Sequence, residues 1–252
     1  MANIMNDVPD YIEARIRQRP LTPGRVVAGS TPVVAFGNVL TATVATLGWN
    51  PSKLEFLDHS GNELLDDARR LETLASIGES DLVEASAEAI RRVFHGCNDY
   101  FLRRPYKNWF NKLEKILKHL NVSYYDGSAC HLDFIQWATD PVWSELPRDD
   151  QARLINSDLS FLRRQLLQEK IRILLLNGRG IVRAYLKGFG GELSESTISG
   201  ASRIRLFTGR DARGIKVIGW NINLQSSFGV SNEEIEKIGD AVKMVVNSEG
   251  AR

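Results

Sequence analysis

The stretch TATVATLGWNPSKLEFLD, residues 41–58, decides the fold that the sequence predicts. Residues 41–47 are nearly all small, β-branched or apolar, a composition typical of a buried strand. Gly48-Trp49-Asn50-Pro51-Ser52 then ends this strand in an abrupt turn. In an open α/β sheet, ligands bind just beyond the carboxyl ends of the strands. We therefore expect this turn, and Asn50 within it, to belong to a functional site.

The rest of the chain alternates helical patterns with strand-like runs, of which IRILLL (residues 171–176) is the clearest strand. Helices are expected at residues 7–19, 64–77, 80–94, 107–120, 150–168, 181–187 and 231–246, and strands at residues 31–36, 41–47, 129–138, 171–176 and in a hairpin after residue 200. This alternation predicts an α/β fold, a three-layer α/β/α arrangement with a mainly parallel central sheet. No repeat or boundary interrupts the pattern, so we expect a single domain over residues 1–252, with residues 1–30 as an N-terminal helical extension.

Composition places the 252-residue chain among ordinary soluble proteins, with 43% hydrophobic and 25% charged residues. A formal net charge of +1 means that an anionic partner would have to be met by local patches. Cys97 and Cys130 lack metal-site spacing and are expected to be free thiols in a reducing compartment. No apolar run approaches the roughly 20 residues of a membrane helix, and the N-terminus lacks a signal-peptide pattern. We expect a cytoplasmic protein without membrane association, and a monomer by default.

Several common catalytic motifs are missing from the chain. There is no P-loop, no HExxH and no GxSxG, and the four histidines show no ligand spacing, so no metal site is expected. Polar residues instead follow three predicted strands. These junctions lie at residues 48–52, 131–139 and 219–227.

At these junctions the chain resembles the uracil-DNA glycosylase superfamily. Gly48-Trp49-Asn50-Pro51 matches the GxNP form of its first motif, which is typical of the mismatch-specific and single-strand-selective branches. The resemblance extends over most of the chain from about Val33, and residues 221–227 lie where the second motif, HPSP or NPSG, is expected. It implies base excision from DNA: a nucleotide is flipped out of the duplex, its base is held, and water adds to the sugar carbon. No metal or redox cofactor is implied.

The resemblance also implies roles for individual residues. Asn50 would position the attacking water, with Trp49 beside the base, and either Phe101 or Tyr100 would stack on the flipped base. Asn221 or Asn223, standing in place of the usual histidine, would hydrogen-bond the leaving base, Leu224 or Gln225 would fill the gap in the duplex, and Ser52, Ser226 and Ser227 would hold phosphates. Each position also has a plain structural interpretation: a turn-forming Asn, a core aromatic or a loop Ser.

Asp133 departs from the superfamily pattern, because uracil-specific members carry an Asn on this strand. An ionised carboxylate only accepts hydrogen bonds, so it favours the exocyclic amine at N4 of cytosine over a uracil carbonyl. Ordinary cytosine must be spared in the host genome, which leaves a modified cytosine. The superfamily includes an enzyme that removes glucosylated 5-hydroxymethylcytosine and so blocks phage replication. Asp133 and the long segment 53–99, which could reshape the pocket, favour this substrate. Alternatively, Asp133 pairs with an Arg or caps a loop.

Three other functions stay open from the sequence. The chain could be a uracil or mismatch repair glycosylase, in which case Asp133→Asn would leave uracil activity intact. It could be a DNA-binding member of the fold without chemistry. It could also be an α/β enzyme for small molecules, in which case DNA binding would be weak and insensitive to salt.

Overall fold

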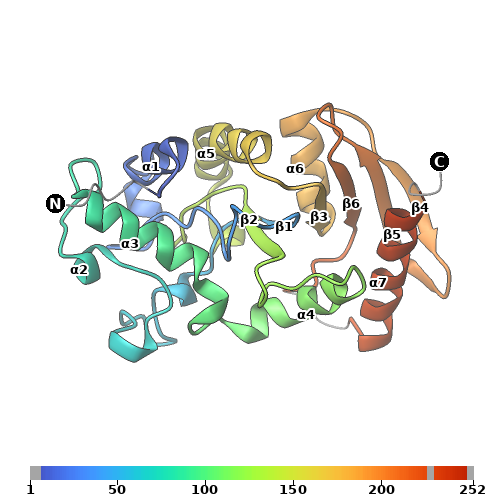
Figure 1. The fold of residues 1–252 in the computed structure, drawn as a ribbon, viewed down its shortest axis with the longest axis horizontal. Coiled ribbons are helices and arrows are strands. Elements are labelled where there is room, and N and C mark those ends of the chain that lie inside the picture. Colours follow the sequence, from blue (N-terminus) through green and yellow to red (C-terminus); the bar gives the residue numbers. More distant parts are fainter. Residues whose placement is uncertain (1–6, 226–229, 249–252) are drawn as a thin grey trace. The chain divides into compact units, whose positions relative to one another are not determined.

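The computed structural model describes residues 7–225 and 230–248 (Figure 1). The chain forms two compact units, each assembled from segments that lie far apart in the sequence. Unit 1 consists of Met1–Phe36, Trp49–Arg104 and Asp133–Gln165, and unit 2 of Gly37–Gly48, Pro105–Leu132 and Leu166–Arg252. The prediction of one domain over the whole chain stays a prediction.

The sheet has six strands in the order β2-β1-β3-β6-β5-β4, and all but the last residue of β2 belong to unit 2. The strands are β1 (Val44–Gly48), β2 (Ala129–Asp133), β3 (Ile173–Asn177), β4 (Ser194–Ile198), β5 (Ala201–Arg210) and β6 (Lys216–Trp220). β1, β3 and β6 are parallel, with Val44 opposite Ile173 and Ile173 opposite Lys216. β4 and β5 extend the sheet as an antiparallel hairpin. The predicted α/β class with a mostly parallel central sheet is confirmed.

Parallel strands that are covered on both faces are apolar along their whole length. Every residue of β1 and of β6 is buried. Lys216 is the charged exception, and its Nζ donates to the carbonyl oxygens of Val245 and Val246, both at 3.1 Å. These carbonyls lie near the C-terminal end of helix α7 (Asn232–Asn247), where a cation is favourable.

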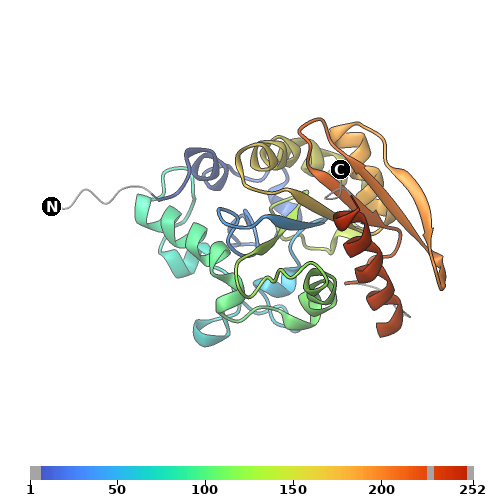
Figure 2. The same cartoon turned by 45° about the vertical axis from the view of Figure 1, so that its right-hand side comes forward.

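Helices lie on both sides of the sheet (Figures 1 and 2). Helix α6 (Arg179–Phe189) packs on β3 and β6, and α7 packs on β4, β5 and β6. A Cβ on Gly219 of β6 would lie 2.7 Å from Val182, so only glycine lets α6 approach this closely. Helix α4 (Lys107–Lys118) packs against α7. The arrangement is compatible with three α/β/α layers, as the sequence predicts.

Unit 1 is built from helices and long irregular segments. Its helices are α1 (Asp10–Ile16), α2 (Leu74–Ile77), α3 (Ala87–Asn98) and most of α5 (Arg148–Gln168). Arg15 donates to Asp158 Oδ2 at 2.6 Å and to Gln136 Oε1 at 3.0 Å, and the backbone N–H of Gln136 donates to the same Asp158 oxygen at 2.9 Å. This buried network fixes the segment that follows β2.

Four predictions of secondary structure are wrong. The strand expected at residues 129–138 ends at Asp133. Residues 31–36 form no strand, because their backbone groups bond to separate groups and not to a neighbouring strand. Val33 N–H donates to Gln136 O, and Val34 O accepts from Gln165 Nε2. Of the helix expected at residues 64–77, only Leu74–Ile77 is α-helical. The helix expected from residue 80 begins at Ala87, where the Ser86 side chain caps it.

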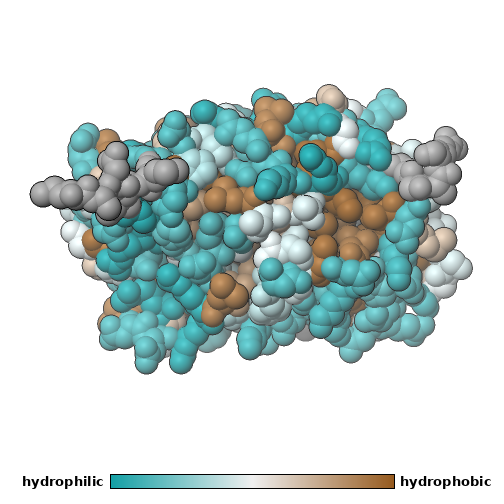
Figure 3. All heavy atoms as spheres, viewed as in Figure 1, coloured by the Kyte–Doolittle hydropathy of each residue, from teal (hydrophilic) through white to brown (hydrophobic). Residues whose placement is uncertain are grey.

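In the view of Figure 3, hydrophilic side chains cover most of the surface, and the largest brown area lies over unit 2 beside α7. Met244 of α7 is among the exposed large apolar residues. Among the described residues, no helix combines the length and apolar character that crossing a membrane requires.

Candidate functional site

Asn50 is held by a set of hydrogen bonds that fixes its side-chain amide. Nδ2 donates to Pro51 O at 2.9 Å, to Thr139 Oγ1 at 3.1 Å and to Trp137 O at 3.5 Å. Two of these partners are carbonyl oxygens, which only accept, so the end of the amide beside them is the nitrogen. Within the described residues nothing donates to Oδ1 of this half-buried side chain. The arrangement presents Oδ1 as an oriented acceptor, which can accept a hydrogen bond from a water molecule.

The neighbours of Asn50 have structural roles in the turn. Trp49 stacks on Trp143 with ring centroids 5.3 Å apart, and it also contacts Phe134 at 5.7 Å. Its ring is therefore already part of an aromatic cluster. Ser52 accepts from Leu54 N–H at 3.2 Å and begins a short 3-10 helix, η2 (Lys53–Glu55). This is the turn-forming role that the sequence left open for a loop serine.

The two aromatic candidates for stacking differ in what they contact. Tyr100 is 0% exposed, and its hydroxyl donates to Glu55 Oε2 at 2.6 Å. Its ring meets Phe36 and Phe101 edge to face, as the core-packing interpretation expects, and its stacking role stays a prediction. Phe101 is 5% exposed and meets Tyr100 edge to face, with centroids 5.1 Å apart. Both rings are thus buried, and the choice between them for stacking stays a prediction.

Asp133 is the last residue of β2 and is buried, at 6% exposure. Its backbone carbonyl accepts from Gln136 Nε2 at 2.9 Å, which ties Asp133 to the network around Arg15. Burial raises the pKa of a second carboxyl of unit 1, that of Glu55, to about 7, and the charge of Asp133 adds a smaller contribution in the same direction. The structure thus adds to the predicted base-reading residue a buried acidic neighbour that the sequence analysis did not single out.

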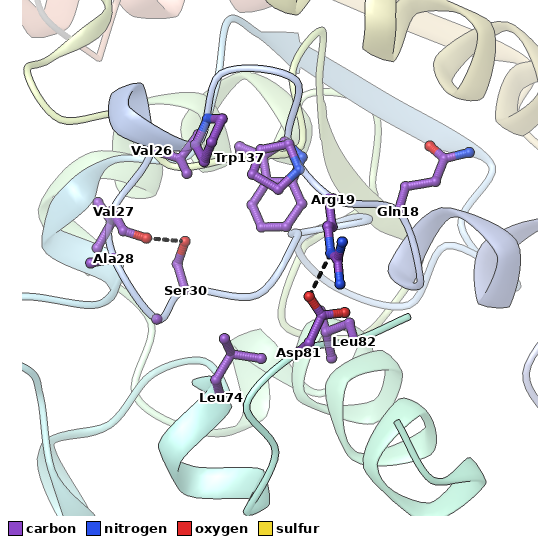
Figure 4. A pocket seen from close by; sticks show the side chains of 13 residues that line it. Gln18, Arg19, Val26, Val27, Ala28, Ser30, Leu74, Asp81, Leu82 and Trp137 are labelled. Carbon is purple, nitrogen blue, oxygen red and sulfur yellow. Dashed lines mark hydrogen bonds and ion pairs between the residues drawn. The ribbon is translucent and has the colours of Figure 1, made fainter. Parts of the chain in front are cut away.

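Unit 1 also contains a cavity of about 230 Å³ (Figure 4). Most of its wall is apolar and includes Val26, Val27, Ala28, Leu74, Leu82 and Trp137. On its polar side Arg19 Nε donates to Asp81 Oδ2 at 2.6 Å. Trp137 connects the cavity to Asn50, because the carbonyl of this residue accepts from Asn50 Nδ2. The cavity suits an apolar or planar group better than a phosphate.

The strand order of the sheet contains a topological switch point. The chain passes from β1 to its neighbour β2 on one side and then returns to β3 on the other side of β1. The topology therefore switches between β1 and β3. Ligands of open α/β sheets bind at the carboxyl ends of strands at such a switch point. β1 ends at Gly48, two residues before Asn50, and β3 ends at Asn177.

Asn177 organises the segment after β6. It is 1% exposed, and its Oδ1 accepts from Trp220 Nε1 at 3.1 Å and from Leu224 N–H at 2.9 Å. Its Nδ2 donates to Asn223 Oδ1 at 2.9 Å and to Gln225 Oε1 at 3.0 Å. All four bonds join the end of β3 to residues 220–225, so one buried amide sets the conformation of the predicted second motif.

Asn221 and Asn223, the two candidates for the leaving-base contact, have different hydrogen-bond partners. Asn221 Oδ1 accepts from Arg205 N–H at 2.8 Å, and its Nδ2 donates to Arg203 O at 3.0 Å. Both ends of this amide bind the backbone of β5, and a catalytic role for Asn221 stays a prediction. Asn223 Oδ1 accepts from Asn177 Nδ2 and from Gln225 N–H, which makes Nδ2 the donor end.

Leu224 and Gln225, the two residues of which one is expected to enter the duplex, differ in exposure. Leu224 is 0% exposed, so filling a gap in DNA would require it to leave the core. Gln225 is partly exposed, and the choice between the two stays a prediction. Ser226 and Ser227 lie outside the described residues.

Sequence reasoning missed Glu55 and Asn177. Glu55 follows the first motif by only a few residues and lies between Leu54 and Phe56, and these apolar neighbours were the available signal of burial. Asn177 precedes Gly178, whose φ of 105° and 3.2 Å approach to Asn223 require glycine. The Asn-Gly pair at the end of the strand is the signal that the sequence offers for Asn177. No family model and no curated protein matches the chain.

Proposed function

We propose that the protein is a DNA glycosylase that hydrolyses the N-glycosidic bond of a flipped, modified cytosine and leaves an abasic site. The observation that carries this proposal is the amide of Asn50, whose nitrogen is engaged three times and whose oxygen is presented as an acceptor. Its place just after β1, at the topological switch point, supports it further. The GxNP resemblance supplies the class of reaction.

In the proposed reaction Asn50 Oδ1 accepts a hydrogen bond from the attacking water and so directs the lone pair of the water oxygen toward the sugar carbon C1′. The bond between C1′ and the base breaks, and its electron pair leaves with the base. The water oxygen becomes the new hydroxyl on C1′, and its released proton balances the charge of the departing base. An amide orients water without adding charge, so binding and positioning supply most of the acceleration. The resemblance implies that Asn221 or Asn223 hydrogen-bonds the leaving base.

Base choice is assigned to Asp133. A carboxylate at the end of β2 accepts from an exocyclic amine, which cytosine carries and uracil lacks. The modified cytosines of phage DNA are the proposed targets, with glucosylated 5-hydroxymethylcytosine first among them, and excision would stop replication at the abasic sites. The uracil or mismatch repair glycosylase remains the competing proposal, and a protonated Asp133 would be compatible with it.

The test is an abasic-site assay on four duplexes that are identical except for one base: cytosine, uracil, 5-hydroxymethylcytosine or its glucosylated form. Each is incubated with wild type, with Asn50→Ala and with Asn62→Ala, and alkali then cleaves abasic sites. Asn62 is an exposed amide of unit 1 whose Nδ2 bonds only within its own loop, to Asp58 Oδ2, and serves as the matched control.

We expect wild type and Asn62→Ala to cleave modified-cytosine DNA. Asn50→Ala should lower the rate of base excision by about 100-fold or more, as removal of a transition-state hydrogen bond does in other enzymes. Cleavage of uracil DNA alone would favour the competing function, a uracil repair glycosylase. DNA binding that falls steeply with salt, without cleavage of any duplex, would refute catalysis and leave a binding protein.

A further inference from the structure

Thr139 accepts one of the two short hydrogen bonds that orient Asn50. An amide nitrogen carries two hydrogens, and Asn50 Nδ2 lies 2.9 Å from Pro51 O, 3.1 Å from Thr139 Oγ1 and 3.5 Å from Trp137 O. The first two distances are ordinary for an N–H···O bond, whereas the third is long. Each hydrogen of Nδ2 therefore has one good acceptor, and the hydroxyl of Thr139 is one of the two.

The two acceptors differ in what they fix. Pro51 directly follows Asn50 in the chain, so its carbonyl belongs to the same turn and moves with it. Thr139 lies 89 residues away, in the segment after β2. Its hydrogen bond therefore fixes the Asn50 amide relative to the segment that follows Asp133, the last residue of β2.

Thr139 is itself held in place by the backbone on either side. Its side chain is 1% exposed. Val27 N–H donates to Ala138 O at 2.9 Å, and Asp140 N–H donates to Arg25 O at 3.2 Å. These two bonds flank Thr139 and fix its backbone against residues 25–27, so its hydroxyl oxygen is a preorganised acceptor for the amide.

We propose that Thr139 is a positioning residue for base excision, whose hydroxyl holds the amide of Asn50 so that Oδ1 orients the attacking water relative to the base at Asp133. This inference rests on the proposed function. Without the hydroxyl, one N–H of Asn50 loses its partner and the side chain can rotate. Misplacing a reacting group by about 1 Å can slow a reaction by about 100-fold. The backbone bond from Ile135 N–H to Trp49 O, at 2.9 Å, still joins the two segments, so the loss falls on the amide and not on the fold.

The experiment measures single-turnover excision from the duplex that wild type cleaves best, with the protein in excess over DNA and above its Kd. Thr139→Val keeps the shape of the side chain but lacks the hydroxyl. We expect it to lower the rate by about 10- to 100-fold and to leave the Kd for DNA near the wild-type value. Thr139→Ser, which keeps the hydroxyl, should restore most of the rate.

Thr31→Val is the matched control. Thr31 is also a buried threonine of unit 1, and its hydroxyl donates to Glu72 O at 2.7 Å, so this variant should keep the wild-type rate. Thr139→Ala, which also removes the hydroxyl, replaces Thr139→Val if the valine variant fails to fold.

Two further measurements separate positioning from a structural role. Since Thr139 acts through Asn50, adding Thr139→Val to Asn50→Ala should cause no further loss of rate, whereas independent effects would multiply. The side-chain amide hydrogens of Asn50 are identified in NMR spectra by their absence from Asn50→Ala. They should exchange with water faster in Thr139→Val than in wild type or in Thr31→Val, and this readout requires no catalysis.

If wild type cleaves no duplex, the proposed function fails, and the role of Thr139 fails with it even where the exchange rates differ. Excision by Thr139→Val at the wild-type rate would overturn the role of Thr139 alone. An equal loss of rate in Thr139→Ser, or a loss that multiplies with that of Asn50→Ala, would also overturn it. Either result would show that the side chain supports the fold and does not act through the amide.

Discussion

Replacing Asn177 by Ala should be among the most damaging single changes in unit 2. The substitution removes four hydrogen bonds from a side chain that is 1% exposed. Two of the lost partners are donors of fully buried residues, the indole N–H of Trp220 and the backbone N–H of Leu224. Each stranded buried donor costs about 1–3 kcal/mol, so we expect a loss of about 2–6 kcal/mol in the free energy of unfolding. Typical domains have only about 5–15 kcal/mol in total.

The assay combines urea unfolding with amide hydrogen exchange. Because the chain forms two compact units, a single global transition is not assumed, and exchange of the Leu224 amide and the Trp220 indole reports on the affected region directly. Asn111→Ala is the control. Its Oδ1 accepts only from the hydroxyl of Tyr125, at 3.1 Å on the exposed surface, and its removal should change stability by less than about 0.5 kcal/mol.

A loss below about 1 kcal/mol in Asn177→Ala, with unchanged protection of the Leu224 amide, would refute the reasoning. It would mean that the segment after β6 is held by packing and not by this amide. Loss of protection at Leu224 without a change in urea midpoint would instead locate the effect in the segment, while the sheet stays intact.

Arg15→Met should lower the free energy of unfolding by about 3–5 kcal/mol, because it leaves the carboxylate of Asp158, which is 1% exposed, without its cation. In a double-mutant cycle, the double variant with Asp158→Leu should recover most of this loss. Gly178→Ala should cost about 1–3 kcal/mol in urea unfolding, because φ is 105° and a Cβ would approach the backbone after β6 to 3.2 Å; an unchanged midpoint would show that this turn relaxes freely. Burial raises the pKa of the Cys97 thiol to about 11 and raises that of Cys130 as well, so neither should react with a thiol reagent at pH 8 until urea unfolds the chain. Labelling of the native protein would contradict their burial.

The sequence alone determined the elements whose signal is local. β1, β3 and β6 are runs of apolar residues buried on both faces, and such runs are visible without knowledge of their neighbours. α4 shows its apolar face by spacing, and α7 begins at the capping box of Ser231 and Glu234 that the sequence predicts. These patterns were sufficient for the fold class and for placing Asn50 just beyond a strand.

The tertiary structure alone decided which polar groups are available for chemistry. Asn221 and Asn223 are chemically identical and two residues apart, yet β5 backbone groups occupy one and the end of β3 orients the other. Residues 31–36 look like a strand, but distant side chains and loops satisfy their backbone groups singly. Burial of Glu55 depends on Tyr100, 45 residues away. Hydrogen-bond partners and desolvation arise between segments far apart in the chain, so no local pattern of residues encodes them.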